Sequence, residues 1–371
     1  MLVLATVWFA TLTGLSCGAC HTAGAQLNDI GRAYLARSNI AQPIGDRPTI
    51  SLKANALFSS DGNGGDLPKI ILDYVDYAAA GKIAPNLAYV VRGHAVDTGE
   101  PGDTTDAFLE WRPLGARVVG GSIALPLETD AQYYRELNTT FLAYEDTVGY
   151  NPFVLDSSHS GAGVYVGRPA NGVEAGAFAF AGYDQNSGLP ASGIDTAFSL
   201  TERSHGFAVS LMRYDGSRPL LPVADRFRRE SIAAVAGIGN LRVDAFYLHG
   251  TDTSALGFAD AVNASAAFVQ IRADLGPRTF AIARYEGQDD GLDSFSRFYV
   301  SDPDAIATTY GGQGNAFGTF FRQSVLGAGY TLGTHVRFTL EDAIAHTPQT
   351  RHTLRAVVAI GASNARLSAG Y

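Results

Sequence analysis

The sequence predicts an all-β fold, a transmembrane antiparallel β-barrel of about sixteen strands with a short helical segment before it. The 371-residue chain is 46% hydrophobic, yet it has no run of about 18 apolar residues, whereas a membrane-spanning helix needs about 20. Charged residues make up only 17%, below the roughly 25–35% typical of soluble surfaces. From about residue 49 onward, apolar and polar residues alternate in short segments, as in a barrel wall with lipid outside and water inside.

Composition excludes several other classes. The net charge is -9 and no run of basic residues occurs, so we expect no nucleic-acid partner. The hydrophobic content argues against disorder, and two cysteines three positions apart cannot form a disulfide framework. Lysine occurs only at Lys53, Lys69 and Lys82. Arginine favours rigid pairing with carboxylates inside a polar channel; a GC-rich genome would produce the same bias.

Residues 1–16 form an apolar stretch without charge. We interpret them as an export signal, although the usual basic start is missing and cleavage after Ala10 would place Trp8 where a small residue is preferred. A truncated start would explain the missing charges. The alternative is a buried N-terminal strand or helix.

The pentapeptide Cys17-Gly18-Ala19-Cys20-His21 contains both cysteines of the chain. C-x-x-C-H is the attachment motif of haem c. The spacing lets Cys17 and Cys20 form thioethers with the two vinyl groups of the porphyrin, and His21 becomes the proximal iron ligand. A thioredoxin-like redox pair is the competing interpretation, but the sequence lacks the strand–helix context of that motif.

Residues 17–46 are predicted as a monohaem cytochrome c segment. Leu27, Ile30, Tyr34 and Leu35 have helical spacing, which predicts one amphipathic helix. One helix covers only one face of a haem, so we expect the haem to lie in or below the lumen of the barrel.

Residues 47–371 are predicted as the outer-membrane barrel. Strands are indicated by alternation such as that of residues 50–58, 107–112, 243–247 and 335–341, where charged residues lie opposite an apolar stripe. A large soluble β-sandwich or lectin-like fold is the alternative.

Short and long connections alternate along the predicted barrel, as in outer-membrane barrels with short periplasmic turns and long external loops. Short turns are predicted near 78–85, 113–116, 169–172, 201–204, 239–240, 275–278 and 332–334, and long loops at 59–68, 96–104, 126–159, 184–192, 215–228, 251–262 and 288–320.

Counting the strands between these alternating connections gives sixteen, from near Thr49 to near Gly361. Residues 362–371 remain either a tail or a seventeenth strand of an eighteen-stranded barrel. Segment 126–159 has some helical spacing, and we expect it either to fold inward and narrow the pore or to form an ordinary external loop.

Several motifs together resemble the fused monohaem cytochrome–porins of the outer membrane, typified by the iron-oxidising outer-membrane cytochrome. Ser16 and the haem motif are followed by Gln26-Leu27-Asn28-Asp29-Ile30-Gly31-Arg32-Ala33-Tyr34 and then by a porin-like region, and Ala80-Gly81-Lys82-Ile83 resembles a turn of that family. The resemblance implies that electrons pass from extracellular Fe(II) through one haem c to a periplasmic carrier. It makes the chain a candidate Fe(II)-oxidising oxidoreductase.

The distal haem ligand is left open between four residues that strand parity or an infolded loop would bring to the lumen, namely His94, Met212, His335 and His159. Each of them also has a simpler interpretation as a structural or channel-lining residue. His249 and His352 fall on the lipid-facing parity near strand ends, which predicts a place in the girdle at the membrane boundary.

The sequence therefore predicts an electron conduit of the bacterial outer membrane, with lipid, an extracellular electron donor and a periplasmic carrier as partners. The acidic stretches 61–66 and 289–293 would attract Fe(II), or they are ordinary acidic loops. Two other functions stay open. One is a diffusion porin whose haem is structural or sensory, and the other is a soluble secreted haem protein on a β scaffold.

Overall fold

The structure is a computed structural model. It describes residues 49–363 except 62–68, 85, 98–99, 103, 114, 128, 130–136, 146–147, 149–150, 152, 156, 169–171, 183–192, 205, 221–222, 256–260, 277, 290–320, 333–335 and 347–349. The predicted signal (1–16), the cytochrome segment (17–46) and residues 364–371 thus lie outside the described residues. Those predictions stay predictions.

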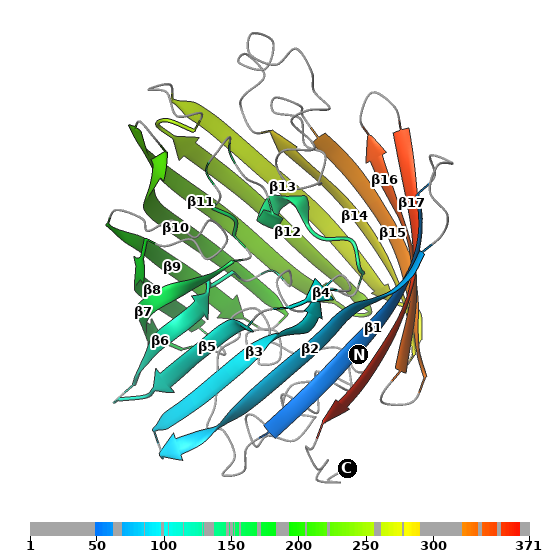
Figure 1. The fold of residues 1–371 in the computed structure, drawn as a ribbon, viewed down its shortest axis with the longest axis horizontal. Coiled ribbons are helices and arrows are strands. Elements are labelled where there is room, and N and C mark those ends of the chain that lie inside the picture. The colour runs from blue at the N-terminus through cyan, green and yellow to red at the C-terminus, as the bar shows by residue number, and fades with distance from the viewer. Residues whose placement is uncertain are drawn as a thin grey trace.

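Antiparallel strands form one closed ring (Figure 1). The elements are β1 (Thr49–Asp61), β2 (Lys69–Ala84), β3 (Leu87–Asp97), β4 (Glu100–Pro101), β5 (Thr104–Trp111), β6 (Ala116–Ala124), α3 (Leu142–Glu145), β7 (Ser158–Gly167), β8 (Gly172–Ala181), β9 (Ile194–Ser204), β10 (Phe207–Leu220), β11 (Val223–Ile238), β12 (Leu241–Asp252), β13 (Val262–Asp274), β14 (Thr279–Asp289), β15 (Phe321–Leu332), β16 (Val336–His346) and β17 (Thr350–Ser363).

Each strand of the ring pairs with its neighbours in sequence, and β17 pairs with β1 over the register Ser51↔Ser363 to Asp61↔Thr353. The two-residue strand β4 lies beside β3, which also pairs with β5, so sixteen strands make up the wall. The predicted count of sixteen is confirmed. The closed β1–β17 pair leaves no edge for another strand between them.

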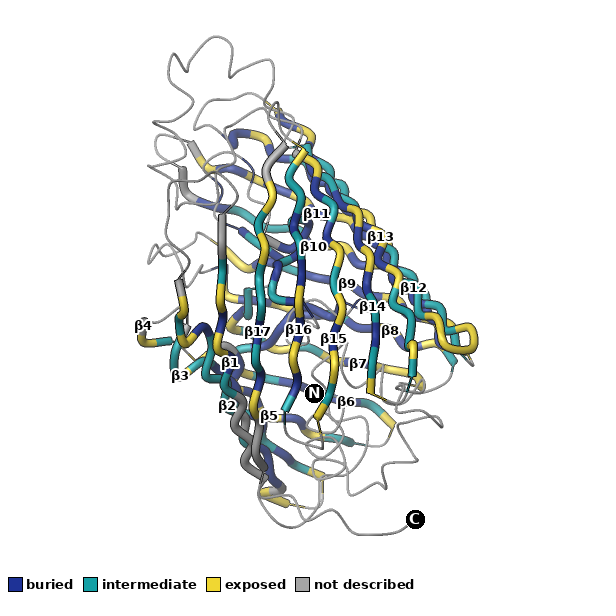
Figure 2. The backbone as a smooth tube through the Cα atoms, turned by 90° about the vertical axis from the view of Figure 1, so that its right-hand side faces the viewer, coloured by how far each residue is buried: buried dark blue, intermediate teal, exposed yellow. Residues whose placement is uncertain are grey.

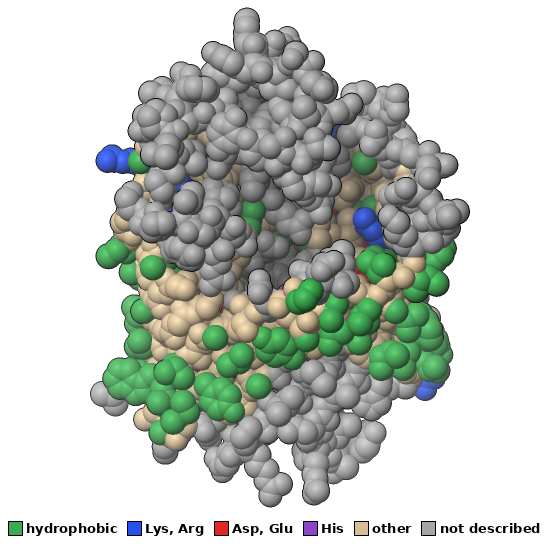
Figure 3. Space-filling model, viewed as in Figure 1, with side chains coloured by type: hydrophobic (Ala, Val, Ile, Leu, Met, Phe, Trp, Pro, Cys, Tyr) green, Lys and Arg blue, Asp and Glu red, His purple; other side chains and the backbone are tan. Residues whose placement is uncertain are grey.

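The wall strands have two faces because side chains alternate along a strand. Exposed residues on the outer face include large apolar side chains such as Leu211, Ile232 and Val269, while Arg203, Asp225 and Glu286 are buried on the inner face. Figure 2 shows the alternation of buried and exposed residues along the strands, and Figure 3 shows a band of apolar side chains across the outer face turned to the viewer. This pattern is the one that a barrel in lipid requires.

Connections at the end where β1 begins are short, at 85–86, 112–115, 168–171, 205–206, 239–240, 275–278 and 333–335. A two-residue hairpin turn needs a left-handed backbone, which Gly239 provides with φ 60°. Longer connections at the other end include 62–68, 125–157, 182–193, 253–261 and 290–320. The predicted alternation of short turns and long loops is thus confirmed in outline.

One predicted loop is wrong. Residues 215–228 are mostly strand, because β10 continues to Leu220 and β11 begins at Val223. Asp215, Gly216 and Ser217 suggested a loop because such residues are common in turns, but they lie within β10, where Gly216 pairs with Phe227 of β11. The turns predicted at 78–85 and 201–204 also lie later, at 85–86 and 205–206, so Ala80-Gly81-Lys82-Ile83 belongs to β2 and is not a turn.

Within the described residues, no helix is long and apolar enough to cross a membrane.

Candidate functional site

The segment between β6 and β7, residues 125–157, folds into the barrel. Its buried side chains include Leu127, Phe141, Tyr144 and Phe153, and the helix α3 contacts β13 and β14 and lies inside the ring of strands in Figure 1. The interpretation of stretch 126–159 as an inward fold is therefore correct. The alternative, an external loop, is wrong for the described residues of this stretch.

Aromatic rings on the inner wall hold the infolded segment. Phe141 packs on Phe268 with ring centroids 4.5 Å apart, and Tyr144 packs on Phe246 at 4.9 Å. Phe153 lies 4.9 Å from Phe227. Such ring contacts add to the free energy gained by burying the apolar area, and they fix the segment against β11–β13.

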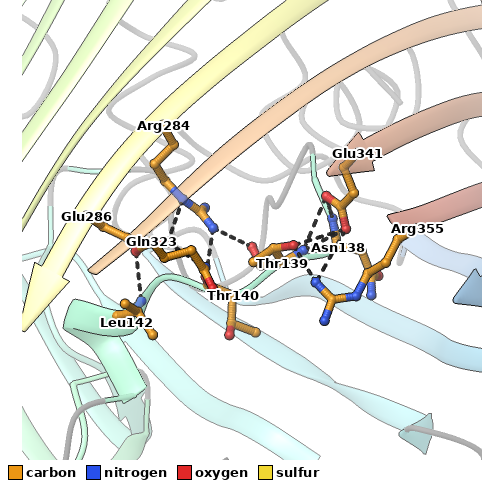
Figure 4. A network of polar contacts seen from close by, with 9 residues as sticks. All are labelled: Asn138, Thr139, Thr140, Leu142, Arg284, Glu286, Gln323, Glu341 and Arg355. Carbon is orange, nitrogen blue, oxygen red and sulfur yellow. Dashed lines mark hydrogen bonds and ion pairs between the residues drawn. The ribbon is translucent and has the colours of Figure 1, made fainter. Parts of the chain in front are cut away.

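A first polar clamp, formed by Arg284, Glu286, Glu341 and Arg355, binds residues 138–142 of the segment (Figure 4). The Glu341 carboxylate accepts hydrogen bonds from the backbone N–H groups of Asn138 at 2.8 Å and Thr139 at 3.0 Å. It also accepts one from the hydroxyl of Thr139 at 3.2 Å. Glu341 is 1% exposed, so these donors replace the water that its charge would otherwise need.

Arg284 and Glu286 of β14 complete this clamp. The Arg284 guanidinium donates to the carbonyl oxygens of Thr139 at 2.9 Å and Thr140 at 2.7 Å. Glu286 accepts the backbone N–H of Leu142 at 2.9 Å, where α3 begins. The partners are backbone groups, so the clamp fixes the path of the segment.

A second polar clamp is made by Asn151 and two aspartates of the wall. The amide nitrogen of Asn151 donates to Asp225 at 2.9 Å and to Asp252 at 2.8 Å, and all three residues are buried. Arg229 pairs with Asp252 at 2.6 Å. The amide thus lies between two carboxylates, one of which is neutralised by an arginine.

Arginine–carboxylate pairs recur on the inner wall. Arg117 contacts Glu174 at 2.9 Å and Arg218 contacts Asp195 at 2.6 Å, and Arg92 pairs with Asp106. These pairs agree with the expectation that arginine was selected for pairing inside a polar channel. The lumen therefore carries fixed charges of both signs.

The wall across the ring from β11 and β12 carries His94 and Asp76. They are register partners on β3 and β2, the distance between His94 Nδ1 and Asp76 Oδ1 is 2.7 Å, and each side chain is 29% exposed. The ring of Tyr74 lies 5.3 Å from that of His94. A charged, partly accessible patch thus lies opposite the infolded segment.

The structure separates the other predicted ligands. His159 of β7 is buried between Phe153, Phe180 and Tyr214, with centroid distances of 5.3–5.4 Å. Met212 is buried in the same aromatic cluster. Both are buried on the inner face, as predicted, and have aromatic side chains as neighbours. His335 and the haem motif Cys17, Cys20 and His21 lie outside the described residues.

Two further histidines have the predicted outward position. His249 follows the outward-facing Tyr247 by two residues on β12, and His352 is exposed on β17, with its Nδ1 3.1 Å from Asp342. The acidic stretches proposed to attract Fe(II) lie outside the described residues except for Asp61 and Asp289. In the part of the chain that the structure describes, no group of three His, Cys, Asp or Glu residues could hold a metal ion.

Sequence reasoning missed the two clamps. The only signal was a charged residue at an inward position of a strand, as at Glu341, and this signal does not tell which distant backbone the charge binds. Asp225 lies in the stretch 215–228 that was predicted as a loop, so it was not recognised as an inward-facing residue of a strand.

Fold and site together define a bacterial outer-membrane β-barrel of the porin architecture, with a lumen narrowed by an infolded segment. Among solved structures, the chain is similar to the anion-selective porin from Comamonas acidovorans, at a TM-score of 0.62 and 9% identity, over 85% of this chain and 99% of the porin. It is also similar to OmpF of Salmonella typhi in complex with daunomycin, at a TM-score of 0.59 and 10% identity, over 85% and 97% of the two chains.

A third similar structure is the outer-membrane channel DcaP of Acinetobacter baumannii, with a TM-score of 0.58, 9% identity and coverage of 85% and 96%. No family model matches the chain. No curated protein matches it either. These likenesses concern the fold.

Proposed function

We propose that the protein is an outer-membrane channel for small polar solutes or ions. The observation that carries the proposal is the infolded segment, which two polar clamps hold against one side of a charged lumen. A plug that only sealed the barrel would not need a charged wall across from it, whereas a selective pore uses fixed charges to choose its solutes.

Conductance through planar lipid bilayers tests this proposal. We expect the purified full chain to give discrete conductance steps, and a change in the ratio of cation to anion permeability when Asp76 is changed to Asn. The matched control is Asp342→Asn, which removes a carboxylate from the outer face. A chain that inserts but never conducts, both alone and with the first clamp weakened by Glu341→Gln, would contradict the channel.

We infer a second candidate function, an electron conduit, because of the C-x-x-C-H motif at 17–21. Haem c, held by Cys17 and Cys20 with His21 as proximal ligand, supplies a one-electron couple when bound. The electron donor would be extracellular Fe(II) and the acceptor a periplasmic carrier.

Among the described candidates, His94 fits a distal ligand best. An imidazole that donates its Nδ1–H to a carboxylate keeps the lone pair on Nε2, and this pairing is usual for metal-ligating histidines. His94 has Asp76 in this position and is partly accessible from the lumen. His159 and Met212 are less suited, since both are buried among aromatic side chains, whereas His94 is partly exposed.

A haem stain of the denatured protein, followed by spectroscopy of the folded protein in detergent, tests the conduit. We expect a covalent stain that the double variant Cys17→Ala/Cys20→Ala abolishes, and a ferric spectrum that changes from low spin to high spin in His94→Ala. His249→Ala is the control, since this histidine lies on the outward face. No stain in the parent protein rejects the conduit and leaves the channel proposal intact.

A further inference from the structure

A ladder of charged side chains faces outward on β10 and β11, above the apolar belt. We define it as Arg213, Asp215, Arg226, Arg228 and Glu230. Its register pairs are Arg213↔Glu230, Asp215↔Arg228 and Ser217↔Arg226, and the next outward pair toward the short turns is Leu211↔Ile232. Both apolar residues of that pair are exposed on the outer face. On β10 and β11 the outer surface thus changes from apolar to charged between one outward register pair and the next.

This height corresponds to the boundary between the acyl chains and the headgroups of the membrane. Tyr247, which pairs with Ile232 on the neighbouring strand, is 48% exposed, and exposed aromatic side chains mark this boundary in outer-membrane barrels. The ladder lies just beyond it toward the end with the long loops, in the part of the β10–β11 hairpin that occupies the stretch 215–228 predicted as a loop. Its side chains are therefore placed among lipid headgroups.

The ladder carries more positive than negative charge. The Asp215 carboxylate accepts hydrogen bonds from Arg213 at 2.6 Å and from Arg228 at 2.9 Å. Glu230 lies 3.8 Å from Arg213. Among the described residues, no ion pair engages Arg226. Three guanidinium groups against two carboxylates leave one positive charge in excess, on a chain whose net charge is -9.

The exposed arginines suit an anion with several oxygens. The side chains of Arg213 and Arg228 are 46% and 44% exposed, and guanidinium groups bind phosphate oxygens in a bidentate geometry. The apolar side chains directly below would contact the acyl chains that belong to the same ligand. Phosphate oxygens above and acyl chains below are the two halves of a phosphorylated lipid.

We propose that this ladder binds the phosphorylated headgroup of a lipid in the outer leaflet of the membrane. The site lies on the outer face of the barrel. It is independent of the lumen, of the infolded segment and of haem.

Binding of lipid A, a diphosphorylated glycolipid, to the full chain in uncharged detergent tests this inference. The comparison ligand is the same lipid after removal of its phosphates. We expect the phosphorylated form to raise the thermal unfolding midpoint, and the double variant Arg226→Gln/Arg228→Gln to bind it roughly tenfold more weakly or worse, the loss expected for removing charged hydrogen bonds. The matched control is Arg168→Gln/Arg278→Gln, which removes two exposed arginines at the other end of the barrel.

A second variant keeps the test valid if the double variant folds poorly. Glu230→Gln removes one carboxylate and leaves the three hydrogen bonds from Arg213 and Arg228 to Asp215 in place, so it should bind phosphorylated lipid more tightly. The inference would be overturned if the parent and the ladder variants bound phosphorylated lipid equally well. It would also be overturned if the control variant lost as much binding as the ladder variant, or if the parent bound inorganic phosphate as tightly as the lipid. Bilayer conductance should be unchanged in all these variants, which separates this test from that of the channel.

Discussion

At the scale of single residues, the infolded segment depends on a few wall side chains that bind its backbone. Glu341 alone accepts two N–H groups and one hydroxyl from residues 138 and 139. A buried carboxylate is stable only while such donors are present. The clamp and the segment therefore stabilise each other.

Glu341→Gln tests the first clamp. Glutamine has the shape of glutamate, but its amide places a donor against the N–H groups that the carboxylate accepted, so we expect a loss of about 2 kcal/mol in the stability of the clamped state. The segment should leave the wall more often, and single-channel conductance should rise or become noisier. Asp342→Asn changes the next residue, on the opposite face of β16, and should leave conductance as it is. A quiet, unchanged conductance in Glu341→Gln would show that the clamp does not hold the segment.

Asn151→Asp tests the second clamp. Its amide donates to Asp225 and Asp252, and a third carboxylate there would repel both. We expect a loss of about 3 kcal/mol or more, which shrinks as the pH falls because a protonated carboxyl regains a donor. Urea unfolding at two pH values measures this effect. Asn240→Asp, in an exposed turn, should cost far less, and an equal cost at both positions would contradict the role of the buried amide.

At the scale of elements, two glycines of the wall have different requirements. Gly121 of β6 has φ 134°, and a Cβ atom there would lie 2.2 Å from the carbonyl oxygen of Ala107 on β5. Gly239 has φ 60° in the turn between β11 and β12, and a Cβ atom there would meet nothing within 4 Å. The first glycine is required by a close approach of two strands, and the second by the turn alone.

Gly121→Ala should therefore destabilise the barrel much more than Gly239→Ala. The cost at Gly239 is that of a left-handed backbone, about 1–2 kcal/mol, whereas Gly121→Ala must separate β5 from β6 or break their register. The fraction of folded protein and the urea midpoint after refolding into lipid vesicles measure both. Similar midpoints for the two variants would mean that β6 adjusts without loss.

The sequence predicts the wall elements well and their long-range contacts poorly. Alternation fixes the face of a residue, as for Met212 and Glu341, because the period of a strand is two. The partner of Glu341 could not be predicted, since Thr139 lies 202 positions away and no local pattern encodes that distance. The long β10–β11 hairpin was missed because Asp215, Gly216 and Ser217 resemble a loop.

At the scale of the whole molecule, the exposed apolar side chains of the outer face predict that the barrel is surrounded by lipid. Val269 lies in the middle of β13, exposed between Ala245 and Tyr285 on the adjacent strands. Val269→Arg should cost about 2–4 kcal/mol in lipid vesicles, measured by urea unfolding. Val269→Ala separates the loss of volume from the gain of charge. An arginine tolerated as well as alanine would mean that this face does not contact hydrocarbon.

The pairing of β1 with β17 has a consequence for biogenesis. The first and last strands of the ring are also the first and last described strands to be synthesised, so the ring cannot close before β17 has been made. Until the final hairpin is available, each of the two edges of the sheet presents a row of backbone donors and acceptors without a partner, and such open edges promote aggregation. Closure therefore has to follow the folding of β16 and β17, because pairing of β17 with β1 covers both open edges at once.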